Sequence, residues 1–194
     1  MASEQFLQET DAALAPDPSL DSARALVESY LPRDETQARF RREILAFIDA
    51  HPLDAHMRSC APGHLTASCL VIDASNGRAL LTHHRKLNRW LQLGGHCDGD
   101  SNLRAVALRE AREESGIEGL MLDPRLVDLD IHPIPARPGE PEHLHLDARF
   151  IVRAPSSARE IVSDESHSLA WISPRDLKHL DVDESVRRLF QITF

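Results

Sequence analysis

The chain has 194 residues, of which 42% are hydrophobic, so it can bury one good core but is too short for two full domains. It carries 22 basic and 31 acidic residues, which gives a formal net charge of -9. The average field of such a protein repels a nucleic-acid polymer, although it still allows a small anionic ligand held through a cation.

Targeting and redox signals are weak. Cys60, Cys69 and Cys97 have neither the spacing of a zinc site nor that of a secreted disulfide framework, which favours a reducing cytoplasm. The N-terminal stretch lacks the basic and apolar regions of a signal peptide, and no stretch reaches the roughly 18 apolar residues of a membrane span. We expect a soluble, unprocessed, cytoplasmic protein with no membrane contact.

The N-terminal third is predicted to be helical. The first 20 residues are polar and acidic and include Pro16 and Pro18, which indicates a frayed lead-in rather than core. Apolar residues then recur at helical spacing over residues 22–30 and 35–50, and Pro32 separates the two helices. We expect this extension, residues 1–61, to cover the core or to form a homodimer contact.

Residues 62–194 alternate between strands and helices. Runs at residues 66–72 and 78–83, joined by a turn at residues 74–77, predict a hairpin. A helix over about residues 101–115 follows, then strands at residues 126–131 and 143–152 with a proline-rich loop between them that contains Pro133. A short strand at residues 169–172 and helical turns at residues 174–179 and 184–191 end the chain. Strands on both sides of a central helix predict an α/β sandwich with a mixed sheet.

The central predicted helix places acids where an apolar face is expected. With Leu103 at 0° and a step of 100° per residue, Val106, Ala107 and Ala111 form an apolar stripe, and Glu110 and Glu114 fall within about 20° of its middle. Glu113 flanks them. Like charges at this spacing repel, and the repulsion grows with burial.

A positive group should therefore sit among these three acids. Arg109 has the i,i+4 spacing to hold the carboxylate of Glu113, but one guanidinium cannot neutralise three acids. A hard divalent cation such as Mg²⁺, which takes oxygen ligands, fits the remainder. Arg112 points away from the stripe and is expected to be solvated.

The segment ahead of this helix is rich in glycine. Gly94, Gly95 and Gly99 let the backbone approach a ligand closely. Asp98, Asp100 and Ser101 stand where a helix N-terminus favours acidic or capping residues. Gly116 provides the C-terminal stop.

These residues together resemble the Nudix box, whose pattern is G-x5-E-x7-R-E-U-x-E-E-x-G-U, with U a bulky apolar residue. Counted from Gly95, the positions that meet the pattern are Arg109, Glu110, Glu113, Glu114, Gly116 and Ile117. Two positions depart from it: Ser101 replaces the first Glu, with Asp100 beside it as a substitute, and Ala111 is smaller than usual. The resemblance extends over roughly residues 62–190.

The resemblance implies a Nudix-like α/β/α sandwich that hydrolyses a nucleoside diphosphate linked to another moiety. It implies Mg²⁺, with Mn²⁺ as the alternative, bound by Glu110, Glu113, Glu114 and the Gly95 carbonyl, while Arg109 orients a carboxylate. The substrate would be a small nucleotide. The rivals are a catalytically silent nucleotide-binding module, favoured by Ser101, and a prenyl diphosphate isomerase, favoured by Cys97.

Residues outside the box are candidates for substrate binding and for the general base. Arg85 and Trp90 precede the glycine-rich segment and could contact phosphate and base, with core packing equally open for Trp90. The two-residue period of a strand puts His143, His145 and Asp147 on one face, either as a polar pocket wall or as a half-solvated strand. Nudix enzymes often draw a carboxylate from a loop ahead of a Trp. Before Trp171 this position corresponds to Glu165, with Asp164 second.

Overall fold

A mixed eight-stranded sheet forms the centre of the computed structural model, in which residues 6–164 and 166–194 are described. Its strands are β1 (Gly63–Ile72), β2 (Ala79–His84), β3 (Arg89–Leu91), β4 (Leu93–His96), β5 (Met121–Leu122), β6 (Asp128–Ile134), β7 (His143–Arg153) and β8 (Ser166–Ile172). The helices are α1 (Asp21–Ser29), α2 (Glu35–Ala50), α3 (Leu103–Ser115) and α4 (Glu184–Thr193), with 3-10 turns η1 (Ala12–Leu14) and η2 (Leu177–His179).

Strand β1 lies at the middle of the sheet, and all ten of its residues are buried. It pairs in parallel with β7 along its whole length and antiparallel with β2 and β4. Its alternate residues supply two cores: Leu65, Cys69 and Val71 join the larger cluster, and Leu70 and Ile72 join the smaller one. A strand that is covered on both faces can carry a continuous apolar run, and the run at residues 69–72 makes the second half of this strand easy to predict from sequence.

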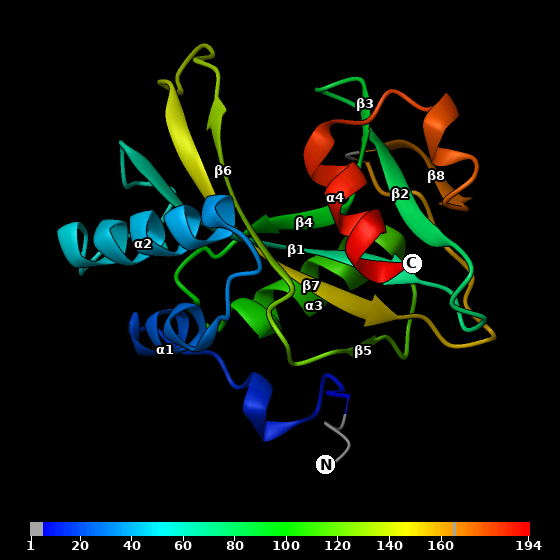
Figure 1. Ribbon diagram of the computed structural model, residues 1–194, viewed down its shortest axis with the longest axis horizontal. Helices are drawn as coiled ribbons and strands as arrows, with labels where there is room; N and C mark the ends of the chain where they lie inside the picture. The colour runs from blue at the N-terminus through cyan, green and yellow to red at the C-terminus, as the bar shows by residue number, and fades with distance from the viewer. Residues whose placement is uncertain (1–5, 165) are drawn as a thin grey trace.

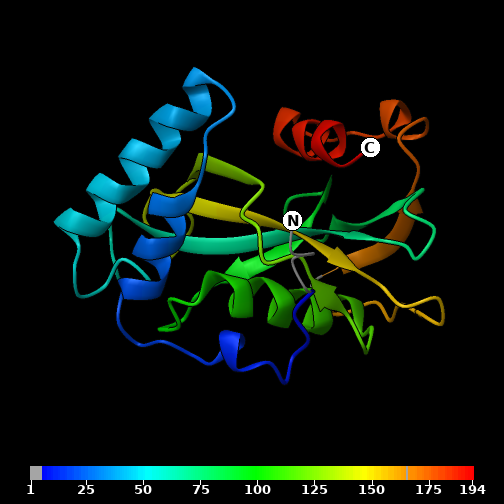
Figure 2. The same ribbon diagram turned by 60° about the horizontal axis from the view of Figure 1, so that its bottom comes forward.

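Helices α3 and α4 cover opposite faces of the sheet (Figure 2). The expected sandwich, with a mixed sheet between helices, is confirmed. Helix α4 is held partly by charge, because Arg188 donates hydrogen bonds to both carboxylate oxygens of Asp128 and to Oδ1 of Asp130, at 2.8–3.1 Å. Asp128 is fully buried, so these bonds fix α4 to β6.

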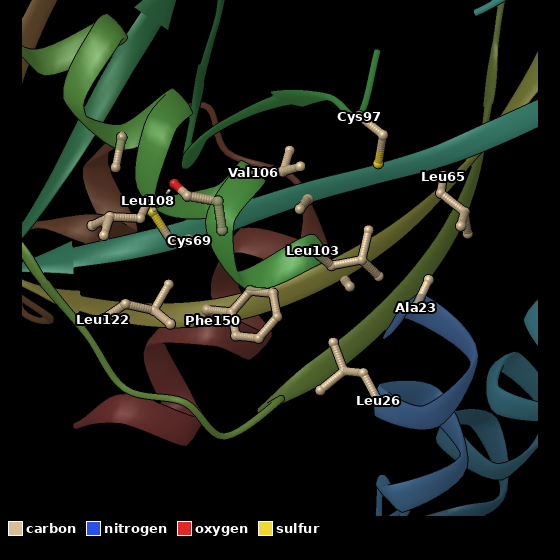
Figure 3. Packing of buried hydrophobic residues seen from close by; sticks show 14 of the residues in the cluster. Ala23, Leu26, Leu65, Cys69, Cys97, Leu103, Val106, Leu108, Leu122 and Phe150 are labelled. Atoms are coloured by element: carbon tan, nitrogen blue, oxygen red, sulfur yellow. Dashed lines mark hydrogen bonds between the residues drawn. The ribbon is translucent and has the colours of Figure 1, made fainter. Parts of the chain in front are cut away.

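Helices α1 and α2 pack beside the sheet, next to β6 (Figure 1). Gln37 of α2 is fully buried, and its side chain exchanges two hydrogen bonds of 2.9 Å with the backbone of Leu129 in β6. The hydroxyl of Tyr30 donates to Oε1 of the same Gln37 at 2.7 Å. Ala23 and Leu26 of α1 join the larger core cluster together with Leu65 (Figure 3). The extension thus packs on the core, which was the first of the two expectations for it.

The expectation of a frayed lead-in is wrong for the residues that the structure describes. Leu7 forms a β-bridge with Leu122 through two backbone hydrogen bonds of 2.8 Å. Leu14 and Leu20 are each 8% exposed and belong to the larger core cluster. The isolated leucines have no periodicity of their own, so their burial depends on a surface that only the folded domain presents.

Three short strands were not predicted. β3 and β5 are too short to show a period, and β4 contains two glycines, so the segment reads as a loop in sequence. Pro133, expected in a loop, lies within β6. Among the described residues, no helix combines the length and apolar character needed to cross a bilayer.

Candidate functional site

Helix α3 begins and ends at residues suited to those positions. The side chain of Asn102 caps its first turn by accepting from the Ala105 N–H, and Gly116 ends it in a left-handed conformation with φ of 66°. The cap falls on Asn102, just after the predicted acidic residues. The apolar stripe formed by Leu103, Val106, Ala107 and Ala111 is buried against the sheet, in the phase that the sequence predicts (Figure 3 labels Leu103 and Val106).

The carboxylate of Glu110 lies directly against Gly95 of β4. A Cβ added to Gly95 would stand 2.2 Å from Oε2 of Glu110, so no other residue type fits here without moving that carboxylate. Burial raises the pKa of Glu110, the adjacent Arg109 opposes this, and the charge of Glu113 raises the pKa further. This acid is therefore crowded and partly desolvated, which favours a bound cation.

Glu114 is hydrogen-bonded to Gly94, the residue before Gly95. It is 8% exposed, and its Oε2 accepts a hydrogen bond of 3.1 Å from the Gly94 N–H. A Cβ on Gly94 would meet the Cα of Ser68 at 2.5 Å, so this strand position also requires glycine. Glu113, by contrast, is exposed. The three acids thus run from the buried glycine segment to the surface along one side of α3.

Arg109 orients a carboxylate, but a different one from that expected. Its Nη2 donates to Oε1 of Glu110 at 2.9 Å and to the His96 carbonyl at 2.8 Å. The expected bond to Glu113 is not what the structure shows. The chain reversal that brings β4 onto α3 supplies the His96 acceptor, and helical spacing alone could not reveal it. Arg112 forms an ion pair with Glu9 of the N-terminal segment.

Ser101, which stands where the Nudix pattern has its first Glu, is fully buried beneath the N-terminal segment. Its N–H donates to the Asp17 carbonyl at 2.7 Å, and the Asp17 N–H donates to Oδ1 of Asp100 at 3.0 Å. Asn102 also donates from Nδ2 to the carbonyls of Ala13 and Ala15, both at 2.9 Å. The turn η1 and the residues between η1 and α1 therefore support the loop at this point.

The donor set along α3 suits a hard cation. Three carboxylates and the Gly95 backbone offer oxygen ligands, which Mg²⁺ and Mn²⁺ prefer. The raised pKa of Glu110 and the absence of a Cβ at Gly95 are the two observations that indicate such a fit.

The face of the sheet that points away from α3 carries a buried polar layer. Asp147 is 3% exposed and accepts hydrogen bonds from Thr66, Ser68 and Arg149, at 2.7–2.9 Å. Arg149, itself 1% exposed, also pairs with Asp130 at 3.1 Å. The alternation predicted for β7 is correct, and the half-solvated alternative is wrong, because His143 and Asp147 are buried on the face that α4 packs against.

Histidines gather at one end of the same face. The ring of His145 lies within 5.5 Å of the ring centroids of His64, His96, His132 and His143. Burial, reinforced by the neighbouring histidines, lowers the pKa of His145 to about 2, and burial also lowers the pKa of His96 to about 4. The rings of His145 and His96 are therefore neutral at neutral pH. Sequence reasoning singled out His145 but missed His64 and His96, although the alternation His64, Thr66, Ser68 in β1 carries the same signal as that in β7.

Arg85 and Trp90 make contacts with β8 and β2. Arg85 donates to the Ser166 carbonyl at 3.0 Å, and Trp90 is half-buried and stacks on His83 with ring centroids 5.0 Å apart. Glu165, the expected general base, lies outside the described residues. Asp164 is exposed. Cys97 is 1% exposed, and burial raises the pKa of its thiol, so it offers no accessible thiolate.

Comparison with known proteins identifies the fold and the family. The chain is similar to nucleoside triphosphatase NudI of Escherichia coli O139:H28 (strain E24377A / ETEC), with 26% identity over 107 residues, which cover 54% of this chain and 75% of that protein. A hydrolase of the NUDIX family from Clostridium perfringens matches in structure with a TM-score of 0.51 and 24% identity, over 73% of this chain and 97% of the other. An Ap4A hydrolase from C. elegans matches with a TM-score of 0.54 and 16% identity, over 66% and 93%.

The chain also matches a family model. The model for the NUDIX domain covers residues 62–191, which include the whole sheet, the glycine segment and α3. The sequence pattern, the mixed sheet between α3 and α4, and this match agree. The chain belongs to the Nudix family of hydrolases.

Proposed function

We propose that this protein is a Mg²⁺-dependent pyrophosphohydrolase that cleaves a diphosphate linkage in a small nucleotide, with Mn²⁺ as an alternative cation. The observation that carries the proposal is the packing of Glu110 against Gly95, in a helix that also presents Glu113 and Glu114. A backbone without a side chain and a desolvated carboxylate meet at this point. Such an arrangement costs free energy unless a cation occupies it.

Each residue of the site has a distinct proposed role. Glu110, Glu113, Glu114 and the Gly95 carbonyl would hold the cation, and Arg109 would keep Glu110 in place from the side. When bound, the cation would neutralise the diphosphate oxygens and lower the pKa of the attacking water. The hydrogen bond from Gly94 to Glu114 fixes the distance between β4 and α3, and with it the spacing of the ligands.

The acid that accepts the proton from water is proposed to come from the segment before β8. The N–H of Ile161 donates to the Ser115 carbonyl at 2.6 Å, so this segment passes the end of the helix that carries Glu113 and Glu114. That contact supports Glu165 as the general base, with Asp164 as the second candidate.

Substrate recognition is proposed to involve Arg85, Trp90 and His145. NudI is named as a nucleoside triphosphatase, and the structural neighbours include an Ap4A hydrolase and a dihydroneopterin triphosphate pyrophosphohydrolase of E. coli. Their shared chemistry, an aromatic base joined to a phosphoanhydride, supports a nucleoside di- or triphosphate derivative as the substrate. Trp90, stacked on His83, is suited to pack on such a base.

The two rival functions receive less support. A silent module was favoured by Ser101, yet the backbone bonds from the Asp17 segment support the same loop. An isomerase would need an accessible thiolate, and Cys97 is buried. All three cysteines are free, which supports the proposed cytoplasmic compartment.

The test is a substrate screen with Mg²⁺ and water labelled with ¹⁸O. Nucleoside triphosphates, nucleotide sugars, ADP-ribose and dinucleoside polyphosphates would be incubated with the protein, and the products separated by chromatography. We expect a mononucleotide product, with one labelled oxygen in one of the two phosphate-containing products. Glu113→Gln should be inactive, and Glu118→Gln, an exposed acid just beyond α3, should behave as wild type. Binding of nucleotides without turnover, with either cation, would contradict hydrolysis.

A further inference from the structure

Three histidines from three neighbouring strands meet on the sheet face opposite α3. His64 belongs to β1, and β1 lies between β4, which carries His96, and β7, which carries His145. His64 is directly opposite His145 in the register, and His96 is opposite Thr66, two residues from His64 and on the same face. One potential ligand nitrogen from each ring lies within 4.8 Å of the other two.

Two of these three rings carry buried nitrogens without the partners that buried polar atoms require. His64 is 3% exposed, and neither of its ring nitrogens has a hydrogen-bond partner among the described residues. Nε2 of His145 is likewise buried without a partner in that part of the chain. Buried polar atoms are nearly always satisfied, so the unpartnered nitrogens of His64 and His145, which converge with the ring of His96, indicate a missing ligand. Neutral imidazoles offer lone pairs, which a cation would accept.

We propose that His64, His96 and His145 form a transition-metal site, with Zn²⁺ as its ion, separate from the carboxylate site on α3. Three imidazoles with an open fourth position are a zinc donor set, whereas Mg²⁺ prefers oxygen ligands. Tetrahedral zinc with bonds of about 2.0–2.1 Å holds its nitrogens roughly 3.3 Å apart. The present separations, which are within 4.8 Å, would have to shorten to that value when the ion binds.

The surroundings of the three rings supply an outer layer. His143 stacks on His64 with centroids 4.9 Å apart, and its Nδ1 lies 2.9 Å from the Pro141 carbonyl. On the other side, His132 lies edge-on to His145 and bonds to Asp130 at 3.0 Å. His64 and His145 are thus packed against neighbouring rings. With an ion bound, His145 would reach substrate only through that ion.

The proposed site is connected to the hydrolytic site by one residue. The carbonyl of His96 accepts the hydrogen bond from Arg109, which in turn holds Glu110. An ion that fixes the His96 ring would therefore also fix the end of β4 against α3. We expect zinc to raise the thermal stability of the protein independently of Mg²⁺.

One other group of potential ligands must be separated from this site. His51, Asp54 and Cys60 also offer atoms within 4.8 Å of one another. Burial raises the pKa of Cys60 to about 11, so its thiol stays protonated and is a poor ligand at neutral pH. His51 therefore provides a matched control for a histidine substitution in the proposed site.

The experiment is a zinc titration of metal-stripped protein in excess Mg²⁺, with a chromophoric chelator as competitor. We expect one tight equivalent in the wild type and in His51→Ala. In His64→Ala the loss should exceed the roughly 10–100-fold that outer partners of a metal site contribute to affinity. Zinc uptake that is equal in His64→Ala and wild type, or that is lost in His51→Ala, would overturn the proposal.

A second measurement needs no variant. Imidazole ¹⁵N spectra of the wild type should show that exactly one nitrogen in each of three rings shifts on addition of zinc, and Co²⁺ should give the absorption of a tetrahedral site. Unchanged imidazole resonances at saturating zinc would overturn the site even if His64→Ala failed to fold. Neither readout depends on turnover, so failure of the proposed hydrolysis would not affect it.

Discussion

Replacement of Gly95 by alanine should disable the active site without unfolding the protein. The new Cβ would stand 2.2 Å from Oε2 and 2.6 Å from Cδ of Glu110, whereas ordinary contacts begin at 3.4 Å. The carboxylate must therefore retreat by about 1 Å, and a misplacement of that size can lower the rate by about 100-fold. Backbone strain does not contribute, because Gly95 is not among the residues with positive φ.

The assay is kcat at saturating Mg²⁺, together with the melting temperature. Gly77→Ala is the matched control, since its Cβ would meet only the Ser75 side chain at 3.4 Å, far from the site. If the clash acts through Glu110 alone, Gly95→Ala should add no further loss to Glu110→Ala in a double-mutant cycle. A folded Gly95→Ala protein with kcat within about threefold of wild type, or additive losses in the cycle, would refute this reasoning.

Three further predictions concern the cation, the buried charges and the N-terminal extension. Excess EDTA should abolish turnover, and Glu114→Gln should do so while leaving the protein folded, as circular dichroism would show; undiminished kcat would contradict the site assignment. Burial alone would raise the pKa of Asp130, but His132, Arg149 and Arg188 lower it overall, so its contribution to stability is present above the ordinary pKa of 3.8 and is lost as the pH falls. The difference in unfolding free energy between wild type and Asp130→Asn should thus shrink below about pH 4, and a difference that is constant with pH would count against it. Deletion of residues 1–52 should lower solubility and stability because it uncovers β6 and removes the bonds from Gln37; a stable, active monomer would show that the extension is dispensable.

Local spacing determined much of the site. The helical phase of Leu103, Val106 and Ala107 places Glu110 and Glu114 toward the sheet, and both prove to contact β4. Residues three and four apart on a helix lie on one side of it whatever the rest of the fold does. The acids and the glycines ahead of them could therefore be identified from the sequence, as could the α/β class.

What the sequence could not determine are contacts between segments that are distant along the chain. Arg109 donates hydrogen bonds to Glu110 and to the His96 carbonyl rather than to Glu113, because β4 lies beside α3. The lead-in around Leu14 became part of the core through a surface made by other elements. The histidines show the reason most directly. The period of a strand fixes which face His64, His96 and His145 occupy, but only the order β4-β1-β7 brings the three rings together, and strand order is decided by the tertiary structure.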